Sequence, residues 1–174
     1  AECGLLPKAH QVFEEIPLRD IVSWTLLITG YAQLGETNQV FFLFDRMRED
    51  ITQDPNLITF VGVLTACSHG GLVDKGCMCF EHMILGTIGP PTLEHYSCMI
   101  DMLGRAGQLD KMVAIVEHMP LHPNRVVWST ILGACRKWGD TEVGGEAFLH
   151  ALGLDDEDAA SYVSMSNIYT YSIS

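Results

Sequence analysis

The chain has 174 residues, of which 48% are hydrophobic and 18% are charged, and its formal net charge is −12. This acidic balance argues against nucleic-acid binding through a broad positive field, since such a field must attract phosphates. No segment approaches the roughly 20 apolar residues that a transmembrane helix needs, which argues against a membrane span. The six cysteines show no disulfide framework and favour a reducing compartment.

Apolar residues recur at helical spacing along the whole chain, and they predict ten helices. The expected ranges are 5–16, 21–34, 37–50, 57–69, 72–85, 93–106, 109–119, 125–138, 141–153 and 159–171. A glycine able to adopt the left-handed conformation follows four of these helices, where a helix would end. These glycines are Gly35, Gly71, Gly107 and Gly139.

An aromatic residue recurs near the start of every second helix, at spacings of 36, 36, 32 and 34 residues. The aromatic residues are Trp24, Phe60, Tyr96, Trp128 and Tyr162. Apolar residues follow at offsets of 3 and 7, which share one helix face with the aromatic. Two helices in each period of 32 to 36 residues predict an all-α fold, an α-solenoid of stacked helical hairpins.

Three further positions, counted from the aromatic residue, are expected at one end of each hairpin. The residue four before it is a good helix N-cap, and the residues two before it and one after it are expected on the free surface. The three series are Asp20, Asn56, Thr92, Asn124 and Asp158; Val22, Ile58, Glu94, Val126 and Ala160; and Thr25, Val61, Ser97, Ser129 and Val163. Two interpretations stay open: plain capping and surface positions, or recognition of one unstacked base per unit.

Several runs resemble plant pentatricopeptide repeat proteins, and together they cover essentially the whole chain. The runs are residues 19–25, 28–33, 59–76, 94–107, 127–136 and 162–169, for example Glu-His-Tyr-Ser-Cys-Met-Ile-Asp-Met-Leu-Gly-Arg-Ala-Gly from position 94. The alternating unit lengths resemble the subclass of normal, long and short repeats, and residues from about 125 resemble its C-terminal E motifs. The resemblance implies a right-handed superhelix of the tetratricopeptide and pentatricopeptide kind.

The resemblance also divides the chain into units. Residues 1–20 would hold the second helix of a truncated short repeat, 21–56 a normal repeat, 57–92 a long repeat and 93–124 a short repeat. Residues 125–158 would form an E-type repeat, and 159–174 the first helix of a truncated second one. The chain is therefore expected to be a piece of a longer protein.

The family resemblance implies an RNA-binding protein of mitochondria or chloroplasts that serves cytidine-to-uridine editing or maturation of transcripts. In that family the fifth and last residues of a repeat select a base. The implied adenine pairs are Thr25 with Asn56 and Ser97 with Asn124; the other base-selecting positions are Val61 with Thr92, Asp20 without its partner, and a guanine-like pair of Ser129 with Asp158. The implied base-sandwiching residues are Val22, Ile58 and Glu94.

Neither the His-x-Glu nor the Cys-x-x-Cys motif of a zinc deaminase occurs in the sequence. We therefore expect no catalytic residue, no metal and no cofactor, and weak binding of single-stranded RNA. The alternative is a noncatalytic scaffold for proteins, in which residues 125–174 recruit a deaminase or an accessory editing factor. Acidic residues without basic partners favour this alternative.

Overall fold

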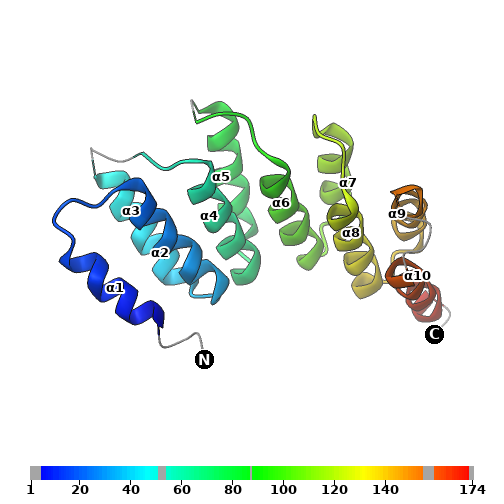
Figure 1. Ribbon diagram of the computed structural model, residues 1–174. Coiled ribbons are helices and arrows are strands. Elements are labelled where there is room, and N and C mark those ends of the chain that lie inside the picture. The colour runs from blue at the N-terminus through cyan, green and yellow to red at the C-terminus, as the bar shows by residue number, and fades with distance from the viewer. Residues whose placement is uncertain (1–4, 51–53, 87, 155–158, 173–174) are drawn as a thin grey trace. The chain divides into compact units, whose positions relative to one another are not determined.

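The structure, a computed structural model, describes residues 5–50, 54–86, 88–154 and 159–172 (Figure 1), and these form ten α-helices without a strand. The helices are α1 (Leu5–Glu15), α2 (Ile21–Gln33), α3 (Thr37–Glu49), α4 (Leu57–Gly70), α5 (Val73–Leu85), α6 (Leu93–Arg105), α7 (Leu109–His118), α8 (Arg125–Trp138), α9 (Thr141–Leu154) and α10 (Ala159–Ser172). The expected all-α fold is confirmed, and the helix ends fall within one residue of the predicted ranges.

The chain divides into two compact units, Ala1–His95 and Tyr96–Ser174. In the first unit α2 packs against α1, α3 and α4, and α4 packs against α3 and α5. The recurring aromatic residues are buried between these helices: Phe13 meets Trp24 edge-on at 4.7 Å between ring centroids, and Phe44 meets Phe60 in the same way at 5.6 Å. The aromatic residue of each of these repeats is therefore a packing residue, as the offsets predicted.

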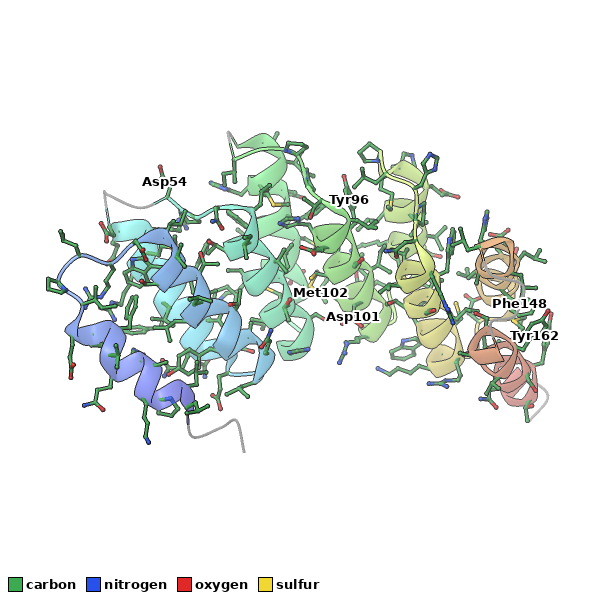
Figure 2. The ribbon with its side chains drawn as sticks, viewed as in Figure 1. Asp54, Tyr96, Asp101, Met102, Phe148 and Tyr162 are labelled. Carbon is green, nitrogen blue, oxygen red and sulfur yellow. The ribbon has the colours of Figure 1, made fainter. Side chains whose placement is uncertain are left out.

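In the second unit α8 packs against α7, α9 and α10, and α9 packs against α10. Phe148 and Tyr162 lie edge to face with ring centroids 5.2 Å apart (Figure 2). Gly104 allows α6 to approach α8, because a Cβ added there would lie only 2.8 Å from the Cβ of Ala134. The indole N–H of Trp138 donates to the Gly104 carbonyl at 2.8 Å across the same contact.

The four glycines predicted at helix ends all have positive φ: 75° at Gly35, 66° at Gly71, 73° at Gly107 and 73° at Gly139. Their left-handed conformation turns the chain, so that backbone N–H groups just after the helix donate to the last carbonyls of that helix. The Leu72 N–H, for example, donates to the Cys67 carbonyl at 2.9 Å. Each glycine thereby makes a sharp corner between two helices. Among the described residues, every helix is too short or too polar to cross a membrane.

Candidate nucleic-acid interface

Three of the five predicted N-cap residues cap a first helix in the expected way. A carboxylate or amide oxygen of Asp20, Asn56 or Asn124 accepts a hydrogen bond from the backbone N–H three residues later. The donors are Ser23, Thr59 and Val127, at distances of 2.8, 2.9 and 3.1 Å. These bonds place the side chains of Asp20, Asn56 and Asn124 at the start of a helix, each with a second polar atom that the cap bond does not use.

Thr25 and Asn56, the first predicted base-selecting pair, are joined through one side chain. The hydroxyl of Thr59 lies 2.9 Å from the hydroxyl of Thr25 and 2.9 Å from the amide oxygen of Asn56. The Asn56 backbone N–H also donates to the Thr59 hydroxyl at 3.2 Å, which completes a reciprocal capping box. The structure therefore brings Thr25 and Asn56 together, and hydrogen bonds with Thr59 fix both side chains.

Thr25 departs from the expectation that the residue after the aromatic lies on the free surface. Thr25 is only 7% exposed, and Val61, the equivalent residue of the next repeat, is half-buried. The reason is the neighbouring first helix: α4 packs against α2 on this side, and the Thr25 hydroxyl turns toward Thr59. The free-surface prediction is therefore wrong for Thr25, while its role in base selection stays a prediction.

Thr92 does not cap α6 in the way that its residue type suggested. The bond runs in the opposite direction, because the Nδ1 of His95 accepts from the Thr92 N–H at 3.1 Å and lies 2.8 Å from its hydroxyl. The Nε2 of His95 lies 2.8 Å from the Leu57 carbonyl, to which it donates. Burial lowers the pKa of His95 below its usual range, and the residue is only 1% exposed.

The second predicted adenine pair, Ser97 and Asn124, lies in the second unit. Ser97 is half-buried on α6, and Asn124 is exposed at the start of α8. Ser129 is exposed on α8, whereas its predicted partner Asp158 lies outside the described residues. The remaining base-selecting candidate, Asp20, is exposed, and hydrogen bonds from the Ser23 hydroxyl and backbone N–H lower the pKa of its carboxyl.

The predicted base-sandwiching residues are exposed, as their offset requires. Val22 is 57% exposed and Ile58 is 60% exposed, and they occupy equivalent places in the first turns of α2 and α4, which pack side by side. Isolated exposed aliphatic side chains are common, but two at equivalent repeat positions form a regular apolar edge. Glu94 is also exposed and puts a charge at the next equivalent place.

The hairpins and their capped ends match a known repeat. The family model described as the PPR (pentatricopeptide repeat) repeat matches residues 22–50, 58–85 and 94–122. A mitochondrial pentatricopeptide repeat-containing protein of Arabidopsis thaliana is 43% identical over 171 residues, which cover 98% of this chain and 27% of that protein. The chloroplastic protein ELI1 of the same plant is 39% identical over 169 residues, which cover 97% of this chain and 27% of that protein.

The chain belongs to the pentatricopeptide repeat family. It spans about a quarter of the length of these two relatives. Two solved structures of the pentatricopeptide repeat protein PPR10 share the fold. PPR10 in complex with an 18-nt psaJ RNA element has a TM-score of 0.85 at 19% identity, covering 97% of this chain and 26% of that one. PPR10 from maize has a TM-score of 0.74 at 22% identity and covers 97% and 25%.

Two cations near the ends of first helices were missed by the sequence interpretation. Arg105 and Lys137 both lie nine residues after the aromatic of their repeat, and this shared offset was the available signal. The Lys137 ammonium donates to the Arg105 carbonyl at 2.9 Å, and both residues line a hollow of about 270 Å³ that also contains Thr130 and Asp101. Asp101 pairs with the Arg105 guanidinium at 2.8 Å, so part of this positive charge is balanced.

No group of three or more potential metal ligands occurs in the part of the chain that the structure describes. Burial raises the pKa of the Cys135 thiol to about 12 and also raises the pKa of Cys79. Both thiols are therefore protonated at neutral pH and are poor nucleophiles and poor metal ligands. Cys135 is buried and acts as a small packing side chain, whereas Cys79 is half-buried.

Proposed function

We propose that this pentatricopeptide repeat protein binds single-stranded RNA sequence-selectively, one base per repeat, as part of an organellar editing or RNA-maturation factor. The unit types implied by the resemblance, normal, long and short repeats followed by E motifs from residue 125, belong to this proposal. So does a location in mitochondria or chloroplasts, which is supported by the names of the relatives, one mitochondrial and one chloroplastic. The editing chemistry would come from a deaminase domain outside these 174 residues or from a partner, because the zinc motifs of a deaminase do not occur in this sequence.

The observation that carries the proposal is the joined pair of Thr25 and Asn56. Two polar side chains of one repeat are joined through Thr59, and the exposed aliphatic residues Val22 and Ile58 lie in the first turns of the same two helices. The aliphatic residues offer contact to the faces of a base, and the amide and hydroxyl offer hydrogen bonds to its edge. The geometry thus combines a stacking surface and a polar edge at one repeat.

Arg105 and Lys137 supply cations that the net charge of −12 obscures. Both are exposed at equivalent repeat positions, which supports contacts with successive phosphates of one strand as part of the proposal. Because each base contact contributes about 1 to 3 kcal/mol and association itself has a cost, two or three usable repeats give weak binding. We therefore expect affinity that is weak and falls as salt rises.

The test compares two short single-stranded RNAs of equal length, one with adenines and one with uridines only, by fluorescence anisotropy at low salt. The adenine RNA is expected to bind better, and the double variant Arg105→Gln, Lys137→Gln is expected to weaken both complexes about equally. Equal affinity for the two RNAs would remove sequence-selective binding from the proposal. Unchanged affinity in the double variant would show that Arg105 and Lys137 do not contact the phosphates.

A second function, recruitment of a protein, is favoured by the surface after residue 140. The segment from Asp140 onward has seven acidic residues and no Lys or Arg, and its helices expose Leu149, Tyr162, Val163 and Tyr169. An acidic surface repels RNA backbone, whereas mixed aromatic and acidic surfaces suit a basic protein partner. Glu142→Lys with Glu146→Lys should reduce binding of a purified cytidine deaminase or accessory editing factor in a pairwise assay. Undiminished binding would exclude this surface.

A further inference from the structure

We infer that Thr59 is a positioning residue that decides which edge of the Asn56 amide faces the base. This inference rests on the proposed function, because it presumes that Thr25 and Asn56 select a base. Thr59 was not among the predicted base-selecting residues, it is fully buried, and it contacts both members of the pair. Its buried hydroxyl is therefore well placed to orient both of their side chains.

The orientation of Asn56 follows from its donors. The backbone N–H of Thr59 can only donate, so the Asn56 atom 2.9 Å from it must be the carbonyl oxygen Oδ1. The Thr59 hydroxyl donates to the same oxygen at 2.9 Å, which gives that oxygen two hydrogen bonds. The Asn56 oxygen is thereby held inward, and the NH₂ group is the part of the amide left to meet a ligand.

The orientation of Thr25 follows from the single proton on Thr59. The Thr59 hydroxyl gives its proton to Asn56 Oδ1 and accepts the Asn56 backbone N–H at 3.2 Å. Its contact with Thr25 at 2.9 Å must then use the Thr25 proton. The Thr25 oxygen is left with lone pairs and no proton, so toward a base it acts as an acceptor.

In the adenine pairing that the proposed function assigns to this repeat, we place the Asn56 NH₂ group opposite the ring nitrogen of the base and the Thr25 oxygen opposite its exocyclic group. Adenine and cytosine each present a ring nitrogen that accepts beside an amine that donates. Guanine and uracil present a ring N–H beside a keto oxygen, which is the opposite pattern. Asn56 could satisfy the opposite pattern only by turning its oxygen outward, which breaks the bonds from Thr59. Thr59 therefore favours amine-bearing bases over keto bases at this repeat.

The second predicted pair, Ser97 with Asn124, lacks the hydroxyl that Thr59 supplies to the first pair. At Asn124 the residue that corresponds to Thr59 is Val127, whose backbone N–H donates to the Asn124 amide oxygen at 3.1 Å. Valine has the shape of threonine without a hydroxyl, so it gives the amide oxygen one donor where Thr59 gives two. The Asn124 amide should therefore be less strongly oriented than the Asn56 amide, and Val127→Thr should add the missing donor.

A merely structural role for Thr59 would be to stabilise α4 through its capping box. Thr59→Val removes the hydroxyl at nearly constant shape and keeps the backbone bond, whereas Thr59→Ser keeps the hydroxyl. A structural role lowers stability and weakens all RNAs alike. A positioning role changes the ratio of affinities for RNAs that differ in one base. The affinity ratio of amine to keto bases, measured beside thermal unfolding by circular dichroism, separates the two roles.

The experiment uses the whole chain and four RNAs with A, C, G or U at one position in a constant background, that position being scanned along the RNA. Wild type should favour A and C over G and U by about tenfold at the position that repeat contacts. Thr59→Val should reduce the ratio by about threefold or more, the value of one ordinary hydrogen bond, and Thr59→Ser should restore it. Val127→Thr should raise the ratio at the position contacted by the second pair.

Each outcome decides one statement. An unchanged ratio in folded Thr59→Val, or a lost ratio in Thr59→Ser, would overturn the positioning role while the proposed function stands. Wild type without any base preference would overturn the proposed function itself, and the inference with it. If Thr59→Val does not fold, the Val127→Thr ratio decides, since this variant adds a hydroxyl and removes no contact from the first unit.

Discussion

The two units share one packing plan and differ at their polar ends. In the first unit α2 and α4 approach closely at Gly62, and in the second α6 and α8 approach at Gly104. The asparagine caps look alike in sequence, yet Asn56 has a reciprocal capping box while Asn124 has a single backbone bond. Repeat packing therefore tolerates different side chains at the third residue after the cap, and that residue sets how many hydrogen bonds the cap side chain accepts.

The largest expected effect tests the shared packing. In Gly104→Ala the new Cβ would lie 2.8 Å from the Cβ of Ala134, which is attached directly to backbone and cannot swing away. We expect a loss of about 2 kcal/mol in unfolding free energy by chemical denaturation, a typical cost of overpacking. The control Gly133→Ala meets nothing within 4 Å and should be neutral or stabilising. Equal stability of the two variants would show that the α6 and α8 approach is not tight.

The next effect tests the difference between the caps. Asn56→Ala removes a cap that engages both the backbone and the side chain of Thr59, whereas Asn124→Ala removes one backbone bond. We expect a loss of about 1 to 2 kcal/mol for Asn56→Ala and about 1 kcal/mol or less for Asn124→Ala. Urea denaturation of both variants would check this order. A larger loss at Asn124 would contradict the greater hold on Asn56.

The pH dependence of stability tests His95, which lies three residues after Thr92, as Thr59 lies three residues after Asn56. Burial lowers the pKa of His95 in the folded chain, so the unfolded chain takes up a proton first as pH falls through the ordinary histidine value of about 6.5. Unfolding free energy should therefore decrease from pH 7.5 to 5.5, even though the neighbouring Glu94 favours the protonated form.

The control for His95 is His95→Gln, which keeps a polar side chain that does not titrate. The lowered pKa values of Glu14 and Asp20 affect stability only below about pH 4.5, outside this window. The variant should show a flatter slope of unfolding free energy against pH. An identical slope in the variant would assign the pH dependence to other groups.

The smallest expected effect lies at the surface of the first unit. Glu14 accepts hydrogen bonds from Arg46, which also lies over the Trp24 ring at 5.5 Å, and this partner lowers the pKa of the carboxyl. Because the Glu14 side chain is 41% exposed, solvent screens the pair. Glu14→Gln should cost about 0.5 kcal/mol or less, and the loss should shrink in high salt. A salt-independent loss would contradict a screened ion pair.

Much of the fold could be predicted because it depends on local signals. Helix periodicity and the four helix-ending glycines gave boundaries that differ by at most one residue from those in the structure. The caps at Asp20, Asn56 and Asn124 were equally local, because a cap bonds a backbone amide only three residues away. Spacing alone was enough for these features.

The features that sequence could not give depend on neighbouring helices. Thr25 is buried because α4 covers it, and its partner Thr59 is 34 residues away. His95 is buried because its ring reaches the Leu57 carbonyl, 38 residues away, and this bond also reverses the cap at Thr92. Residue type and helix offset do not indicate which hydroxyl or imidazole ring forms a hydrogen bond with a residue of the neighbouring repeat.

Base selection by the Thr25 and Asn56 pair is tested most directly by Asn56→Asp. Aspartate caps a helix as well as asparagine, so folding should be retained. One carboxylate oxygen stays with Thr59, and the other replaces the outward NH₂ group with an acceptor. Wild type should bind an RNA with adenine at the contacted position more tightly than the guanine RNA, and the variant should reverse this preference, each by about tenfold. Equal affinity for both RNAs in wild type and variant would contradict base selection at this repeat.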